Sequence, residues 1–180
     1  MYAVGDNVVY PCHGAGKIVK IEQRAVLGRR REYLTIELHH NRMTALIPVE
    51  NAERAGLRKV VAADAVDEVL QVLRDAPTAM PEKWHARSKR IQEKLGTGDI
   101  LEVAQVVRSL AVRQEDKALP TGEKQLFSRA QRILASELMY ARGLTAEEAE
   151  SLLEGVLEGA RADRPAALAA VREPAPRAPR

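Results

Sequence analysis

The sequence predicts an α+β fold in which a small antiparallel β-barrel, or a strongly curled sheet, precedes a compact bundle of helices. Up to about residue 55, short runs of alternating apolar and polar residues are separated by turn residues, which is typical of strands. From residue 56 onward, apolar residues recur three and four positions apart, which is typical of helices. We therefore expect a β-barrel domain over residues 1–55 and a helical domain over residues 56–161.

About five strands fit into the first 60 residues. The four clearest have the sequences NVVY (7–10), GAGKIVKIEQRAV (14–26), EYLTIEL (32–38) and TALIP (44–48). Turn residues separate them at Pro11 to Gly16, at Leu27 to Arg29 and at His39 to Arg42. Because these connections leave no room for crossover helices, the strands should pair antiparallel in a small barrel or a curled sheet.

Five helices are predicted after Gly56. The first lies within AADAVDEVLQVLRDA, stops before Pro77 and presents one apolar face, formed by Val66, Val69, Leu70 and Leu73. The others are predicted to begin at Pro81, Asp99, Thr121 and Thr145, with Gly96 and Gly143 ending the second and the fourth. Glu102 and Glu148 follow Asp99 and Thr145 at the spacing of a capping box. Residues 162–180, rich in Pro, Ala and Arg, are predicted to form a flexible tail.

The composition is that of a globular protein. Charged residues make up 29% of the chain, and no apolar run approaches the roughly 20 residues that span a bilayer. The N-terminal segment lacks the basic and apolar regions of a signal peptide, so we expect a cytoplasmic protein with no membrane partner. The only cysteine, Cys12, excludes an internal disulfide, and no second pair of metal ligands accompanies it. We therefore expect no metal site.

Motifs of nucleotide-dependent enzymes do not occur in the sequence. It contains neither G-x-x-x-x-G-K-[ST] nor a G-x-G-x-x-G that follows a strand. The glycine cluster HGAG (13–16) leads into a predicted strand, so it lacks the helix N-terminus that would hold a phosphate. We therefore expect a protein that is not an enzyme and that uses no cofactor.

The segment PEKWHARSKR (81–90) contains the only tryptophan of the chain, Trp84. Residues 81–98 carry five basic and two acidic side chains, and helical geometry aligns four of the cations in one stripe: Lys83, Arg87, Arg90 and Lys94. In one interpretation Trp84 begins an apolar seam that packs on the bundle, together with Ser88, Ile91 and Leu95. In the other, Trp84 overhangs the first turn and wedges into nucleic acid at unstacked bases, with the cations on phosphates.

Several ordered segments resemble the CarD/CdnL family of bacterial RNA polymerase-binding transcription regulators, whose amino-terminal module also occurs in transcription-repair coupling factor. The similarity spans about residues 2–160. It is carried by VGDNVVYPCHGAG, REYLTIEL, IPVENAERAGLRKV, PEKWHARSKRIQEKLGTGDILEVAQVVRSL and GEKQLFSRAQRILASEL. The resemblance implies a Tudor/SH3-like barrel that binds the polymerase β subunit and a helical domain that contacts promoter DNA at the upstream fork of the transcription bubble.

The resemblance also implies a DNA-binding set. The family's tryptophan at the position of Trp84 wedges into the minor groove at that fork. Arg87, Lys89 and Lys124 match basic positions of the family, and Arg90, from the positive stripe, completes the expected set. Ala86 stands where some members have a further arginine.

For polymerase binding, the resemblance implies two positions on the barrel. Arg24 matches a family arginine on the second strand, and Leu46 stands where some members have a second arginine. We therefore expect a monomeric transcription factor that binds the RNA polymerase β subunit and stabilises the promoter open complex, acting in the cytoplasm at the nucleoid. Two alternatives stay open: a DNA- or RNA-binding module that works without polymerase, and a protein adaptor with Trp84 buried.

Overall fold

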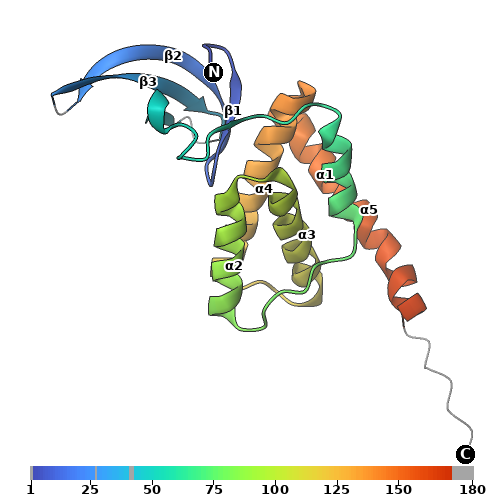
Figure 1. Ribbon diagram of the computed structural model, residues 1–180. Coiled ribbons are helices and arrows are strands. Elements are labelled where there is room, and N and C mark those ends of the chain that lie inside the picture. The colour runs from blue at the N-terminus through green and yellow to red at the C-terminus, as the bar shows by residue number, and fades with distance from the viewer. Residues whose placement is uncertain (1, 27, 41–42, 172–180) are drawn as a thin grey trace, which may run out of the picture.

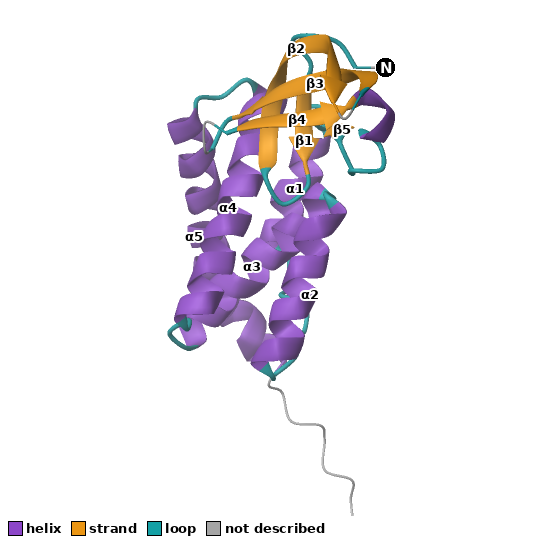
Figure 2. Cartoon of the chain, turned by 90° about the vertical axis from the view of Figure 1, so that its left-hand side faces the viewer, coloured by secondary structure: helices purple, strands orange, loops and turns teal. Residues whose placement is uncertain are grey.

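A computed structural model of the chain describes residues 2–26, 28–40 and 43–171 and has two parts, a β-sheet and a bundle of helices. The sheet contains β1 (Asn7–Tyr10), β2 (Gly14–Val26), β3 (Arg29–Leu38), β4 (Thr44–Pro48) and β5 (Arg58–Lys59). The bundle contains α1 (Ala65–Arg74), α2 (Trp84–Thr97), α3 (Ile100–Asp116), α4 (Thr121–Arg142) and α5 (Ala146–Val171). Figures 1 and 2 show the sheet at one end of the bundle. The predicted α+β fold is confirmed.

The sheet is antiparallel throughout, with the strand order β4-β3-β2-β1-β5. In the part of the chain that the structure describes, β4 and β5 are its two edges and do not pair. The sheet is therefore curved and open, which agrees with the second of the two predicted forms, a strongly curled sheet, and not with a closed barrel. The four predicted strands are present, and β3 begins three residues earlier than expected. β5, only two residues long, is too short to show a periodic pattern in the sequence.

Two boundaries differ from the expected ones. The apolar core of the sheet includes Leu57, and β5 pairs with β1, so the sheet part extends past the expected boundary at residue 55. The helix α5 continues to Val171, ten residues into the segment predicted as a tail, where the Ala-rich sequence favours a helix. Residues 172–180 lie outside the described residues.

Side-chain caps define several helix ends. Asp99 accepts a hydrogen bond from the Leu101 N–H (2.8 Å), whereas Glu102 forms an ion pair with Lys94 and gives no capping hydrogen bond back. At α5 the capping box is complete, because Glu148 accepts from the Thr145 N–H (2.8 Å) and Thr145 Oγ1 accepts from the Glu148 N–H (3.2 Å). The helix α2 ends at Gly98 with a left-handed backbone (φ 74°), two residues beyond the predicted Gly96.

The helix α4 joins the sheet to the bundle through a buried glutamate. Glu137 is 2% exposed, and Arg58 of β5 donates to both of its carboxylate oxygens (2.5 and 2.8 Å). The Val61 N–H donates to the same carboxylate (3.2 Å). Because this carboxylate and its partners come from different parts of the fold, the ion pair fixes how the sheet sits on the bundle.

The neighbouring Ser136 makes a second junction. Its Oγ accepts a hydrogen bond from the Ala15 N–H of β2 (2.9 Å) and donates to the Ile133 carbonyl (2.7 Å). A Cβ atom at Gly14 would lie 2.7 Å from this Oγ, and the Gly14 backbone has a φ of 89°. Position 14 therefore requires glycine both for its conformation and for the close approach of α4.

Substitution of Arg58 by methionine should destabilise the contact between the sheet and α4. The variant leaves Glu137 buried without its cation, so we expect the free energy of unfolding to fall by roughly 3 kcal/mol. Chemical denaturation at pH 7 measures this loss. The control is Arg54→Met, which removes an exposed arginine from the same segment. Equal stability of the two variants would contradict a structural role for the Arg58–Glu137 pair.

Candidate nucleic-acid interface

Trp84 lies at the end of α2 and is partly exposed. It is the first residue of the helix, and its side chain is 37% exposed. The last turn of α2 reaches the sheet, where Cys12 Sγ contacts the Leu95 carbonyl, so Trp84 lies at the end of α2 away from the sheet. Neither the bundle core nor the sheet core includes it. The alternative in which Trp84 is buried is therefore wrong.

The indole rests on the first turn of α4. A Cβ atom at Gly122 would lie 2.9 Å from Cζ2 and 3.3 Å from Cη2 of Trp84. A residue without a side chain at this position therefore lets the ring lie against the helix backbone. One side of the indole is supported by α4, and Trp84 keeps about a third of its surface exposed to solvent.

The buried seam of α2 differs from the predicted one. Ile91 and Leu95 are buried as expected, but the third member is Arg87 at 3% exposure. These three residues are spaced by four, so they form one row on the face that packs against the bundle. Trp84 precedes this row and projects beyond it.

The Arg87 guanidinium is fully engaged inside the protein. Its Nε donates to Glu123 Oε1 (2.9 Å), and Nη2 donates to the same oxygen. Its Nη1 donates to the carbonyls of Pro81 and Glu82 (2.7 Å each), which precede Trp84. The guanidinium carbon lies 5.9 Å from the centre of the Trp84 ring. The expectation that Arg87 neutralises a phosphate does not fit this burial, and its contacts fit a residue that positions Trp84.

Glu123, in the first turn of α4, is the acidic centre of this network. Its side chain is completely buried, and its second oxygen accepts from Arg113 Nε (2.8 Å). Burial by itself raises the pKa of the Glu123 carboxyl, but hydrogen bonds from Arg87 and Arg113 outweigh it, so the pKa is lowered. The carboxylate is therefore charged at neutral pH and binds two arginines, of which Arg87 lies next to the indole.

The other predicted cations are exposed. Lys89 has a 79% exposed side chain and lies 3.8 Å from Glu93, and Arg90 and Lys124 are exposed on α2 and α4. Lys124 is two residues from Gly122, on which the indole rests. Lys94 instead donates to Gln105 (2.7 Å), so the predicted positive stripe is interrupted at both Arg87 and Lys94.

The two predicted polymerase-binding residues share the outward face of the sheet. The register places Arg24 opposite Arg31, and it places Lys20, Thr35 and Leu46 in one row across three strands. Because the side-chain period of a strand is two, Arg24 and Leu46 lie on the same face, about 13 Å apart along the strands. Leu46 is 40% exposed on the edge strand β4, and Arg24 pairs with Glu22 on its own strand.

Sequence reasoning missed the residues that support the indole. Glu123 in a first helical turn is typical of a solvent-exposed acid near a helix N-terminus, and Arg113 resembles an ordinary surface cation. Nothing local indicates that α2, α3 and α4 bring Arg87, Arg113 and Glu123 together. Only the packing of three helices reveals this cluster.

Two searches of the described residues have negative results. Among them no group of three or more His, Cys, Asp or Glu side chains is placed to hold a metal ion. Within the same ranges, no helix has both the length and the apolar character needed to cross a membrane.

Both parts of the chain match models of known domains. Residues 2–61 match the CarD-like/TRCF RID domain, and residues 68–154 match the model described as CarD, C-terminal domain. The chain is 33% identical over 151 residues to "Putative transcription factor YdeB" of Bacillus subtilis (strain 168), with 84% of this chain and 99% of that protein covered. A Tudor-like sheet followed by this helical domain defines a class of transcription regulators. The chain belongs to the CarD family.

Substitution of Glu123 by glutamine should destabilise the fold, because Arg87 stays buried without its counter-charge. We expect a loss of roughly 3 kcal/mol in the free energy of unfolding at pH 7. The folded-state pKa of Glu123 lies below its unfolded value of about 4.3, so this stabilisation is present above that pH and is lost as the pH falls through the folded pKa. Denaturation at pH 7 and at decreasing pH measures both effects. A variant as stable as the exposed control, Glu158→Gln, would refute the prediction.

Substitution of Gly122 by alanine should move the indole without harming the helix. Alanine favours a helix by up to about 1 kcal/mol over glycine, whereas its Cβ would overlap the Trp84 ring. We expect unchanged or higher thermal stability together with a red-shifted and more easily quenched emission from the single tryptophan. The control is Gly155→Ala on α5, where a Cβ meets nothing within 4 Å. Identical emission from the Gly122 variant and the wild type would show that Trp84 does not rest on α4.

Proposed function

We propose that this protein is a transcription factor without enzymatic activity that binds the β subunit of bacterial RNA polymerase and stabilises the promoter open complex. Trp84 inserts into the minor groove at the upstream edge of the bubble. The observation that carries this proposal is an exposed indole that lies next to Arg87, which is buried in an ionic network with Glu123 and the half-buried Arg113. A wedge must keep its position when the bubble begins to close, and the ionic network of Arg87 next to the ring supplies that rigidity.

The cations beside the wedge hold the DNA backbone. Lys89, Arg90 and Lys124 are exposed and neutralise phosphates, which orients the protein on the duplex without reading its sequence. Arg87 acts instead as a positioning residue, because its guanidinium is already bonded to Glu123 and to the carbonyls before Trp84. Its effect on DNA is transmitted through the indole.

The sheet domain supplies the polymerase contact. Arg24 and Leu46 share its outward face, and β4 leaves one backbone edge free to pair with a strand of the β subunit, as in β-augmentation. A net charge of +3 supports only weak binding to free DNA, so attachment to polymerase is needed to raise the local concentration of the wedge at the promoter. This activity places the protein in the cytoplasm, at the nucleoid.

The mechanism is a shift in population. Closed and open promoter complexes interconvert, and a ligand changes their ratio only by its difference in affinity for the two. Trp84 finds unstacked bases in the open complex and a continuous stack in the closed one. Bubble collapse then has to expel the indole, so the open complex lives longer.

Replacement of Trp84 by alanine should abolish this effect. Stacking of a base on an aromatic side chain contributes about 1–3 kcal/mol, so we expect the lifetime of the open complex to be at least about fivefold shorter with the variant than with the wild type. The measurement is the decay of open complexes, formed by the cognate polymerase, after addition of a competitor. The same lifetime with both proteins would rule out the wedge.

A sheet variant separates the two contacts. Leu46→Glu places a charge on the outward face, and we expect it to lose binding to polymerase while the emission of Trp84 stays unchanged. The control Val4→Glu changes an exposed apolar residue outside the strands. If Leu46→Glu keeps full activity, or if the wild type binds free duplex tightly, the protein is instead a polymerase-independent nucleic-acid-binding module.

A further inference from the structure

The segment between α1 and α2 is held in place by side chains. Residues 75–83, which we call the strap, contain no helix or strand and lead directly into Trp84. Among the described residues, no backbone N–H of residues 76–83 donates to another backbone group. Most of the strap is exposed to solvent. Its path therefore depends on contacts with side chains of the helices.

Arg108 of α3 joins the end of α1 to the strap. Its Nη2 donates to Thr78 Oγ1 (2.7 Å), and its Nη1 donates to the Val72 carbonyl in the last turn of α1 (2.9 Å). Arg108 is only 5% exposed, and its Nε is buried without a hydrogen-bond partner among the described residues. Burial lowers the pKa of Arg108, and the charge of Asp75 opposes this effect only in part. The buried guanidinium is thus bonded to neutral oxygens and to no carboxylate of the described chain.

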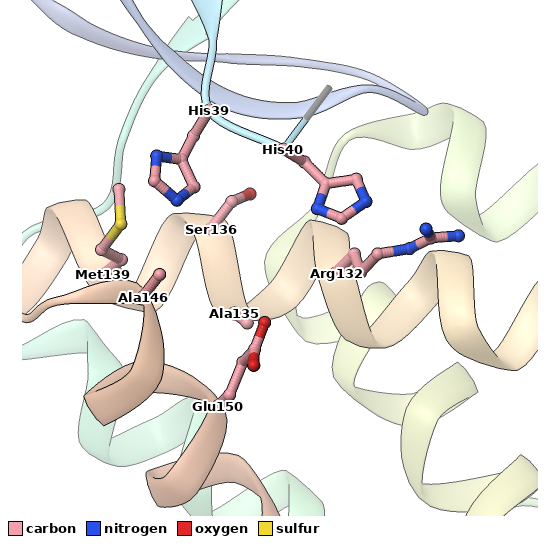
Figure 3. A pocket seen from close by; sticks show the side chains of 8 residues that line it. All are labelled: His39, His40, Arg132, Ala135, Ser136, Met139, Ala146 and Glu150. Carbon is pink, nitrogen blue, oxygen red and sulfur yellow. The ribbon is translucent and has the colours of Figure 1, made fainter. Parts of the chain in front are cut away.

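Two other arginines of the bundle show the usual arrangements. Arg87 is buried and is bonded to Glu123, whereas Arg132 is exposed and lines a pocket that also contains Glu150 of α5 (Figure 3). At position 108 an apolar side chain would avoid the free-energy cost of burying a charge without a bonded acid. The cation at this position is therefore explained by the segment that it holds and not by net stability.

The first turn of α2, which carries Trp84, depends on the strap because it has no side-chain cap. Lys83, the residue before the helix, gives no capping hydrogen bond, and the first turn contains no acidic residue. Arg87 holds two carbonyls at the α2 end of the strap, and Met80 packs against the bundle core. Between Met80 and α1, the hydrogen bond from Arg108 to Thr78 is the anchor. Its loss would free this half of the strap.

We propose that Arg108 is a positioning residue for Trp84. Its hydrogen bond to Thr78 fixes the strap in the path that keeps the indole seated against Gly122. Arg108 is buried and acts through Trp84, so this inference rests on the proposed function. Without the hydrogen bond, the strap has more conformations and fewer molecules hold a seated indole. A binding-competent state that is only partly populated lowers the apparent affinity by that fraction.

The test uses the emission of the single tryptophan in the protein alone. Thr78→Val removes the hydroxyl from an exposed position, and Thr78→Ser keeps it. If loss of the hydroxyl leaves the indole seated in about a third of the molecules, the acrylamide quenching constant should rise about twofold with Thr78→Val. We expect the wild-type value with Thr78→Ser.

Thr97→Val is the matched control. It removes a hydroxyl that donates to the Lys94 carbonyl (2.8 Å) and accepts from the Asp99 N–H (3.1 Å) at the other end of α2. A general loss of helix stability would affect both valine variants alike. We expect quenching of Trp84 to stay unchanged with Thr97→Val.

Arg108→Met tests the arginine itself. Methionine occupies the site without a charge, so we expect a denaturation midpoint close to that of the wild type together with the same twofold rise in quenching. Addition of Thr78→Val to this variant should have no further effect, because both changes remove the same contact. If Arg108→Met does not fold, the Thr78 variants decide the test.

Open-complex lifetimes at saturating protein separate this inference from the proposed function. With the indole seated in about a third of the molecules, the gain in lifetime should fall about threefold with Thr78→Val, while binding to polymerase stays unchanged. Thr78→Ser should keep the full gain. If the wild type gives no gain but Thr78→Val still raises quenching, the proposed function fails and the positioning of the indole stands.

Four results would overturn the positioning role. The first two are wild-type quenching with Thr78→Val and an equal rise with Thr97→Val. The third is a Thr78→Ser variant that behaves like Thr78→Val, because the hydroxyl would then not be the cause. The fourth is a rise in quenching with a full gain in lifetime, because the seat of the indole would then not affect the wedge.

Discussion

Two carboxylates that α4 buries hold this molecule together. Glu123 near the start of the helix binds Arg87 and Arg113, and Glu137 near its end binds Arg58. Burial of a charge raises the free energy of the folded state by several kcal/mol unless the charge is paired and hydrogen-bonded. Only an arrangement that brings the arginines to each carboxylate is therefore stable. Neither pair needs to add much net stability to have this effect. What the pairs specify is a unique arrangement of helices and sheet.

The consequence is a fixed distance between the two surfaces that we propose to bind polymerase and DNA. The two carboxylates are separated by 14 residues, or about 21 Å of helix. Glu123 binds Arg87, which lies next to the Trp84 ring, and Glu137 binds Arg58 of the sheet. Trp84 and the outward face of the sheet are therefore held apart by a rigid helix. A protein that attaches to one partner and places a side chain into another needs such a spacer, because a flexible link would lower the effective concentration at the second site.

The same burial explains the surface of α4. Because both of its acidic side chains are buried, the exposed charged side chains of this helix are all basic, although the whole chain has a net charge of just +3. Counting charges along the chain hides this separation, since Glu123 and Lys124 are neighbours in sequence, yet Glu123 is buried and Lys124 is exposed. Phosphate binding depends on such local potential, and net charge is a poor guide to it.

The sequence by itself determined the elements of this protein. The strands β1 to β4, the five helices and the apolar seam residues Ile91 and Leu95 follow from periodicity and turn chemistry, which act between residues close in the chain. The exposed position of Trp84 followed only as one of two interpretations, because helical spacing alone does not say whether a first-turn side chain enters a core or projects past it. The burial of Arg87, the role of Glu123 and the open edge of the sheet were decided by tertiary structure. Each depends on segments that are distant in sequence. Arg87, for example, has the sequence pattern of a surface cation, but its burial against Glu123 of α4 places it next to Trp84.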